Sequence, residues 1–124
     1  MVNEECQRYE YAKVTLSDNS IYEGECINSI ANGRGKRVYE DGQIDEGIFE
    51  NNELCGYGKR TYKDSKVYIG NFDKGLRDGK GRIIHTIINI KNIKINKEIN
   101  GEWEKDVQKS VKLKLKFAKN AIVK

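Results

Sequence analysis

The 124-residue chain contains no proline, one histidine and three cysteines, and each shortage argues against a class of protein. Disordered linkers are usually rich in proline, so its absence favours an ordered backbone. Cys6, Cys26 and Cys55 include no CxxC pair and are odd in number, which argues against a zinc knuckle and a closed disulfide framework. No apolar run reaches the roughly 18 residues of a membrane-spanning helix. We expect one domain with reduced thiols, without metal or cofactor.

Positive charge is concentrated near the C-terminal end of the chain. Residues 104–124 carry a net charge of +5 and residues 1–103 a net charge of −1, within a total of +4. Residues 1–10 are charged and polar, unlike the apolar segment of a secretory signal peptide. We therefore expect an intracellular protein whose body is neutral and whose tail is basic.

Two short motifs recur in the chain with a common period of 23 residues. The first surrounds a glycine in residues 22–26, 45–49 and 68–72, and it appears again 31 residues later in residues 99–103. The second is a Gly-x-Gly box, and its copies occupy residues 33–35, 56–58 and 79–81. Because two independent motifs keep one period, the chain is predicted to be a repeat protein.

Each repeat is predicted to form a β-hairpin. Residues 35–47 read GKRVYEDGQIDEG, in which two β-prone runs flank residues 41–42, an Asp-Gly pair. Asp-Gly between such runs is a strong signal for a hairpin turn. Asp-Ser at residues 64–65 and Asp-Asn at residues 18–19 occupy the same place in their repeats. Three turns are thus expected at one phase of the period.

The longer last interval predicts a long hairpin over residues 82–100. Its eight additional residues lie between Gly81 and Gly101, and their midpoint falls at residues 91–92. A turn there would lengthen each arm by four residues, and an even number keeps every side chain on its original face. The segment is also rich in isoleucine, which favours strands. The alternative is a loose, low-complexity loop.

These boxes resemble the MORN repeat, whose signature is an aromatic-Glu-Gly-x-aromatic box followed by a Gly-x-Gly box. The resemblance covers residues 12–103, or three to four repeats. It departs from the pattern where Cys26, Asp45 and Ile99 replace aromatic residues and where the fourth unit lacks the Gly-x-Gly box. The resemblance implies an all-β fold, an elongated single-layer twisted antiparallel sheet of consecutive β-hairpins.

The expected organisation has three parts: an N-terminal arm over residues 1–11, the hairpin repeats over residues 12–103, and a basic capping strand or tail over residues 104–124. Apolar residues and lysines alternate strictly in residues 111–117. Alternation of this kind has the period of a strand, so the tail is predicted to add a final strand to the sheet.

Side chains two residues apart share one face of a strand, which places the repeat glycines and the aromatic rings on the same side. A glycine beside a ring lets the ring of the neighbouring hairpin approach the backbone, and the stacked rings then form the core. A ligand groove lined by the rings is the less favoured alternative. The predicted core comprises Tyr22, Gly24, Gly33, Gly35, Tyr39, Gly47, Phe49, Gly56, Gly58, Tyr62, Tyr68, Gly70, Phe72, Gly79, Gly81, Gly101 and Trp103.

No pattern in the chain predicts catalysis. His85 is the only histidine, and it occupies the repeat position of Tyr39 and Tyr62, so it is expected to be a ring of the core. A Ser-His-Asp or Cys-His arrangement would need this residue. Residues 75–80 differ in spacing from a phosphate-binding loop, and no serine or threonine follows Lys80. We predict that the protein is not an enzyme and has no small-molecule substrate.

The resemblance implies a non-catalytic scaffold or structural subunit that mediates protein–protein assembly. Similar proteins often serve cytoskeletal, ciliary, axonemal or cortical complexes, so the expected location is the cytoplasm or cytoskeleton, including the cilium and the cell cortex. The expected partners are other proteins of a larger assembly. Nucleic acid is not expected as a partner, because the basic charge is confined to the tail and does not run with the aromatic residues.

The alternative function is a membrane-surface module that binds acidic phospholipid through basic residues. Arg37 and Arg60 are two candidates, although both can equally pair with Asp45 and stack on rings. Lysines in the tail can likewise protect a sheet edge from aggregation. The candidate partner or lipid contacts are Arg37, Arg60, Lys112, Lys114 and Lys116.

Overall fold

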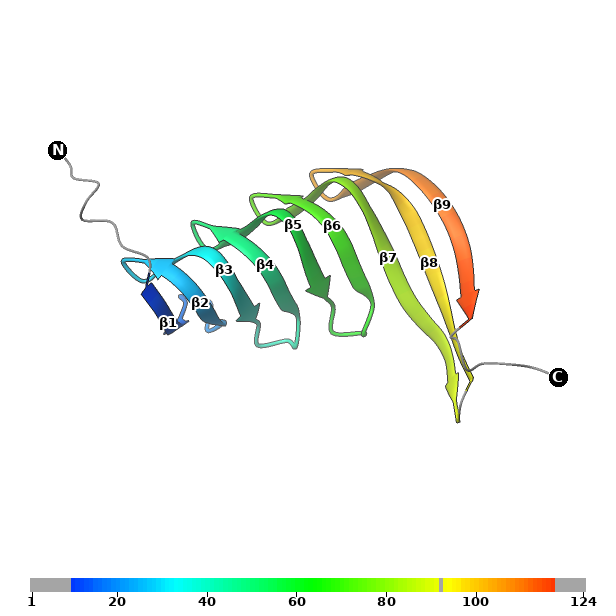
Figure 1. Cartoon of the computed structure of the whole chain (residues 1–124), viewed down its shortest axis with the longest axis horizontal. Coiled ribbons are helices and arrows are strands. Elements are labelled where there is room, and N and C mark those ends of the chain that lie inside the picture. The colour runs from blue at the N-terminus through cyan, green and yellow to red at the C-terminus, as the bar shows by residue number, and fades with distance from the viewer. Residues whose placement is uncertain (1–9, 92, 118–124) are drawn as a thin grey trace.

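The protein is a single open layer of antiparallel strands, as Figure 1 shows for the computed structural model. The structure describes residues 10–91 and 93–117. The strands are β1 (Glu10–Thr15), β2 (Ile21–Ile27), β3 (Ile30–Val38), β4 (Ile44–Glu50), β5 (Glu53–Thr61), β6 (Val67–Asp73), β7 (Leu76–Ile90), β8 (Ile93–Glu104) and β9 (Val107–Phe117). Each strand pairs with the next one along the chain, so the sheet order is β1 to β9. The predicted all-β array of consecutive hairpins is confirmed.

One set of turns contains the aspartates that the sequence marked. Between β3 and β4, Asp41 Oδ1 accepts a hydrogen bond from the backbone N–H of Gln43 at 2.9 Å, and Gly42 has a φ of 99°. Asp18 and Asp64 make the same bond to the residue two places further on. A short acidic side chain that accepts a nearby N–H fixes such a turn locally, and the predicted turns are confirmed.

A second set of turns joins the strands at the opposite ends, and the sequence analysis did not identify it. These turns have two residues each, at 28–29, 51–52, 74–75 and 105–106, and both residues of every turn have positive φ. Two central residues with positive φ define the type I′ turn, whose twist matches that of the flanking strands. The sheet therefore alternates two turn types, one along each side of the array.

The long hairpin consists of β7 and β8, and it extends beyond the other hairpins (Figure 1). Ile90 pairs with Ile93, which places the turn at the expected midpoint. The register shifts between Thr86 and Ile88, so the two arms do not lengthen equally. β9 pairs with β8 along most of its length and is the predicted final strand. Glu10 begins β1 inside the expected N-terminal arm, and one sheet extends from there to Phe117.

The core lies on one face of the sheet, which we call the inner face. Tyr22, Phe49, Tyr68, Phe72 and Trp103 are all at most 4% exposed. Their rings meet edge to face, with centroids 5.0 Å apart in the Tyr22–Phe49 and Tyr68–Trp103 pairs and 5.1 Å apart in the Tyr68–Phe72 pair. Such pairs contribute about 0.5 to 1.5 kcal/mol each beyond area burial. The rings are thus the packing between repeats.

The glycines on the inner face are what let these rings approach the backbone. A Cβ atom at Gly35 would overlap the ring of Tyr22, and one at Gly81 would overlap the ring of Tyr68. The predicted contact between a ring and the bare backbone of the next hairpin is thus present. Gly56 does not share this role, because no atom lies within 4 Å of the position of its Cβ.

Candidate functional site

Arg60, a candidate contact residue, lies inside the sheet. Its Nε and Nη2 donate to the two carboxylate oxygens of Asp45 at 2.8 and 2.9 Å, and Nη2 also donates to the carbonyl oxygen of Gly75 at 2.9 Å. Arg60 is 8% exposed and Asp45 is 1% exposed. Burial acts to lower the pKa of Arg60, but the hydrogen bonds and charge of Asp45 raise it overall. The guanidinium remains charged and joins β4 and β5 to the turn between β6 and β7.

Arg37 occupies the equivalent place one repeat earlier. Its Nη1 donates to the carbonyl oxygen of Asn52 at 2.6 Å, Nε donates to Ser20 Oγ at 2.9 Å, and Nη2 donates to Asp18 Oδ2 at 3.0 Å. The residue is 7% exposed. Neither this arginine nor Arg60 turns its charge to solvent, so their burial favours the alternative of pairing and stacking. Contact of these arginines with a partner or lipid stays a prediction.

The tyrosines of the inner face also bond within the repeats. Tyr22 and Tyr68 donate their hydroxyls to the carbonyl oxygens of the residues three places further on, at 2.5 and 3.1 Å. Burial raises the pKa of each to about 12. Burial also raises the pKa of Tyr39 and Tyr62, which are half-buried. The guanidinium carbon of Arg37 lies 4.5 Å from the ring centroid of Tyr39, so this ring supports a buried charge.

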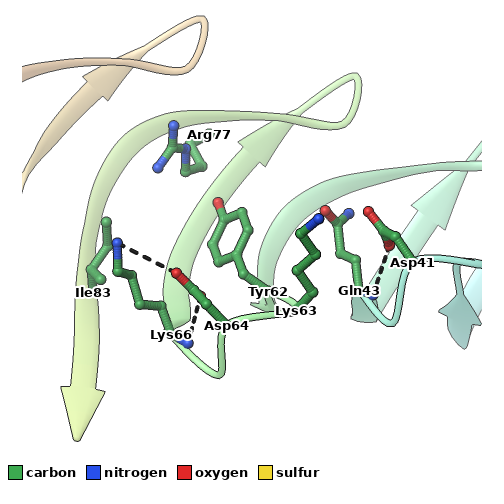
Figure 2. A pocket seen from close by; sticks show the side chains of 8 residues that line it. All are labelled: Asp41, Gln43, Tyr62, Lys63, Asp64, Lys66, Arg77 and Ile83. Atoms are coloured by element: carbon green, nitrogen blue, oxygen red, sulfur yellow. Dashed lines mark hydrogen bonds and ion pairs between the residues drawn. The ribbon is translucent and has the colours of Figure 1, made fainter. Parts of the chain in front are cut away.

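An open cavity of about 380 Å³ lies on the inner face between two of the aspartate turns (Figure 2). Lys66 pairs with Asp64 at 3.6 Å, and the Nε of Arg77 donates to Asp106 at 2.9 Å, so the charges in this region are largely matched. Figure 2 shows Tyr62 standing in the middle of the cavity. The cavity is lined by Asp41, Gln43, Tyr62, Lys63, Asp64, Lys66, Arg77 and Ile83. The lining combines one tyrosine ring with side chains of both charges. Such a surface suits a polar contact with a partner better than catalysis.

Groups suited to metal binding are not brought together in the part of the chain that the structure describes. No group of three or more His, Cys, Asp and Glu side chains is placed there to hold a metal ion. Cys26 is buried and Cys55 is half-buried, and both are free thiols, whereas Cys6 lies outside the described residues. Burial, together with a hydrogen bond to Glu50, raises the pKa of Cys55, so less of its thiol is in the reactive thiolate form.

The two ends of the sheet are open among the described residues, because no strand pairs with the outer side of β1 or of β9. β9 is the longer edge, with 11 residues against 6 in β1. Lys112, Lys114 and Lys116 stand in β9 in register with Asn100, Glu98 and Asn96 of β8. Their side chains lie outside what the structure describes, so the contacts of these three lysines stay a prediction. No helix in residues 10–91 and 93–117 is long and apolar enough to cross a membrane.

The comparison with family models returns the architecture that the geometry shows. The model described as MORN repeat matches three consecutive segments, residues 22–44, 46–67 and 68–85, which together cover about half of the chain. Each segment includes at least one buried ring and most of a strand pair. No curated protein matches the chain. The buried ring lattice, the period of the hairpins and the matched segments agree, and the chain belongs to the MORN repeat family.

Proposed function

We propose that the protein is a non-catalytic scaffold subunit that binds other protein chains through its open sheet. The observation that carries this proposal is the strand order, which leaves β9 as an edge of 11 residues. An edge strand has a row of unpaired backbone N–H and C=O groups, and a strand of another chain can pair with them. The protruding hairpin of β7 and β8 enlarges the surface beside this edge.

The use of the chemical groups supports binding over catalysis. The arginines, tyrosines and aspartates of the inner face bond to one another and to turn carbonyls, so they hold the repeats together. His85 is half-buried on β7 and makes no hydrogen bond to a carboxylate among the described residues. We extend the proposal to an intracellular cytoskeletal, ciliary, axonemal or cortical assembly, because similar MORN proteins often serve such assemblies.

The test uses the full chain in an extract of its native source, with cross-linking mass spectrometry and light scattering. We expect cross-links that place a recurrent partner beside β9 or the long hairpin, and slower hydrogen exchange of β9 amides in the complex. In an edge strand, consecutive N–H groups point alternately to the neighbouring strand and to solvent. Leu113 and Lys114 are consecutive, so one of their backbone N–H groups points away from β8. Replacing that residue with proline removes only the outward donor and keeps the hydrogen bonds to β8.

The outward proline variant is expected to melt like the wild type and to lose the partner. If that variant keeps its partner, the edge is not the binding surface. A wild-type protein that is strictly monomeric and captures no more than an unrelated sheet protein would contradict the scaffold proposal itself.

The membrane-surface alternative loses support because two of its five candidate contacts, Arg37 and Arg60, are buried. It would rest on Lys112, Lys114 and Lys116. Co-sedimentation with phosphatidylcholine vesicles, with and without phosphatidylserine and at two salt concentrations, measures this activity. A variant with all three lysines replaced by threonine should lose lipid binding under this alternative, whereas backbone pairing at β9 would persist under the scaffold proposal.

A further inference from the structure

The outer face of the sheet, opposite the rings, carries two hollows that occupy equivalent places two repeats apart. The first hollow, of about 320 Å³, lies over β1 to β3, and the second hollow, of about 370 Å³, lies over β5 to β8. Each lies over a cross-strand pair of glycines, Gly24 with Gly35 and Gly70 with Gly81. Each also has a highly exposed tyrosine, Tyr11 or Tyr57, at its border.

The first hollow already contains an anionic group of the chain. Glu25 stands at a bulge between β2 and β3, and its Oε1 accepts the backbone N–H of Arg34 at 2.7 Å. Arg34 and Lys36 line the same hollow. A carboxylate that receives a backbone N–H beside two cationic side chains is a local pattern for anion recognition. In the first hollow, the recognised anion is the side chain of Glu25 itself.

The second hollow lacks this resident carboxylate. At the corresponding bulge stands Asn71, whose Nδ2 donates to the carbonyl oxygen of Lys80 at 3.3 Å. None of the described residues that line the hollow is acidic. The two cations remain, as Lys80 and Arg82 stand at the places of Arg34 and Lys36.

The cations of the second hollow are accessible to a ligand. Lys80 is exposed and makes no ion pair with any described residue. The Arg82 side chain is 42% exposed, although its Nη1 lies 3.3 Å from Glu98 Oε2. A guanidinium has five N–H donors, so one ion pair does not use them all. Glu102 stands opposite Lys80 in the register but does not line the hollow. Tyr57 is 66% exposed and offers a ring for the stem of an incoming side chain.

We propose that the second hollow binds a glutamate or aspartate side chain from an acidic segment of a partner protein. The proposal rests on the scaffold function and names the chemistry of its partner. The incoming carboxylate takes the role that Glu25 has in the first hollow, between Lys80 and Arg82. A protein segment fits better than a phosphate group, because the occupant of the equivalent place is a side-chain carboxylate carried by an extended strand. The charge of the hollow is complementary to such a segment.

The chain supplies the design of a blocking variant. Asn71→Glu should place a resident carboxylate in the second hollow, because Glu25 fits the equivalent bulge in the first. Asn71→Gln is the neutral control of the same size. The probe is a short synthetic peptide of alternating glutamate and glycine, titrated into the isotope-labelled full chain while the backbone amide NMR spectrum is recorded. A peptide of alternating glutamine and glycine is the uncharged comparison.

We expect the glutamate peptide to shift the amide signals of Asn71, Lys80 and Arg82, and the glutamine peptide to leave them in place. Asn71→Glu should weaken binding about tenfold or more, as the loss of one charge-assisted hydrogen bond implies, and Asn71→Gln should bind within about twofold of the wild type. Glu102→Gln should strengthen binding by removing a nearby negative charge. Should Asn71→Glu not give a folded spectrum, Lys80→Gln and Arg82→Gln decide, and each should weaken binding.

Three results would overturn the proposal: equal binding by the wild type and Asn71→Glu, equal shifts with the glutamine peptide, or shifts with inorganic phosphate or phosphatidylserine vesicles in the absence of a response to the glutamate peptide. A silent peptide titration combined with partner cross-links at β9 would reject the hollow alone. A silent titration without any captured partner would reject the scaffold function as well.

Discussion

Replacing Asp45 with leucine should destabilise the protein by about 3 to 5 kcal/mol, because the change leaves the buried charge of Arg60 without its counter-ion. The guanidinium would lose two hydrogen bonds of 2.8 and 2.9 Å and keep only the bond to the carbonyl oxygen of Gly75. It cannot move to water without vacating its stack on Phe72, whose ring centroid lies 5.0 Å from the guanidinium carbon. The cost therefore comes from an unpaired buried ion.

The assay is thermal unfolding followed by circular dichroism, with urea titration as a second measurement. At about 3 to 6 °C per kcal/mol for a domain of this size, the melting temperature of Asp45→Leu should fall by about 10 to 30 °C. Arg60→Met should be similarly unstable. The double variant should lie within about 1 to 2 kcal/mol of the wild type, because neither buried charge remains.

The control is the exposed pair of Lys66 and Asp64, whose side chains are 45% and 55% exposed and whose charged atoms lie 3.6 Å apart. Lys66→Met should leave the melting temperature close to that of the wild type, because solvent screens a surface pair. A cost below about 1 kcal/mol for Asp45→Leu, or a double variant in which the two single costs simply add, would refute the assignment of a buried, coupled pair.

Three further predictions concern the rings and the acidic turns. Gly81→Ala should lower the free energy of unfolding by about 3 kcal/mol, because the new Cβ would overlap the ring of Tyr68. Gly56→Ala should lower it by about 1 kcal/mol, through the φ of 82° alone. The opposite order in thermal melts would contradict the ring packing. Raising the pH should destabilise the fold, because Tyr22 and Tyr68 have a pKa of about 12 in the folded chain and tyrosine in the unfolded chain ionises near pH 10. The stability that the neutral rings contribute is fully present below about pH 10, and on the order of 1 to 2 kcal/mol per ring is lost as the pH rises toward 12. Replacing both tyrosines with phenylalanine should flatten that part of a plot of melting temperature against pH. An unchanged slope would exclude the two rings as its cause. For Asp106, burial acts to raise the pKa, but hydrogen bonds from its arginine partner lower it overall, so the stability it contributes is present above about pH 4 and is lost at lower pH. Asp106→Asn should consequently be less stable than the wild type at neutral pH and approach it during acid titration, and a constant difference would show that the carboxylate charge has no part in holding the last turn.

Much of this architecture follows from periodicity. Side chains alternate between the two faces of a strand, so the position of a residue in the repeated boxes predicts its face of the sheet. The 23-residue spacing of the boxes likewise predicts where the aspartate turns and the turn of the long hairpin lie. The two-residue turns between repeats were missed, although Asn-Ser, Asn-Asn, Lys-Gly and Lys-Asp pairs stand at equivalent places. Asparagine and glycine tolerate positive φ, which is the signal that these pairs carry.

The sequence left the placement of Arg37 and Arg60 open between pairing with Asp45 and contact with a partner, because burial of a charge depends on partners distant in sequence. The carboxylate that holds Arg60 belongs to Asp45, and a turn carbonyl 15 residues later completes its bonds. Asp45 stands where the first and third repeats have tyrosine, and Leu54 fills the missing ring's space, with Cδ2 lying 3.2 Å from the Cβ position of Gly47. The first repeat has Ala31 at that place beside its tyrosine.

The serial order of the strands bears on how the protein can be made. Every strand finds its neighbours among the residues that directly precede and follow it in the chain. Contacts of short sequence separation form quickly, and no early segment has to wait for a late one. The first hairpins can close while the ribosome is still adding the last ones, so synthesis itself can guide assembly from the N-terminal end and shield each nascent edge with the strand that emerges next.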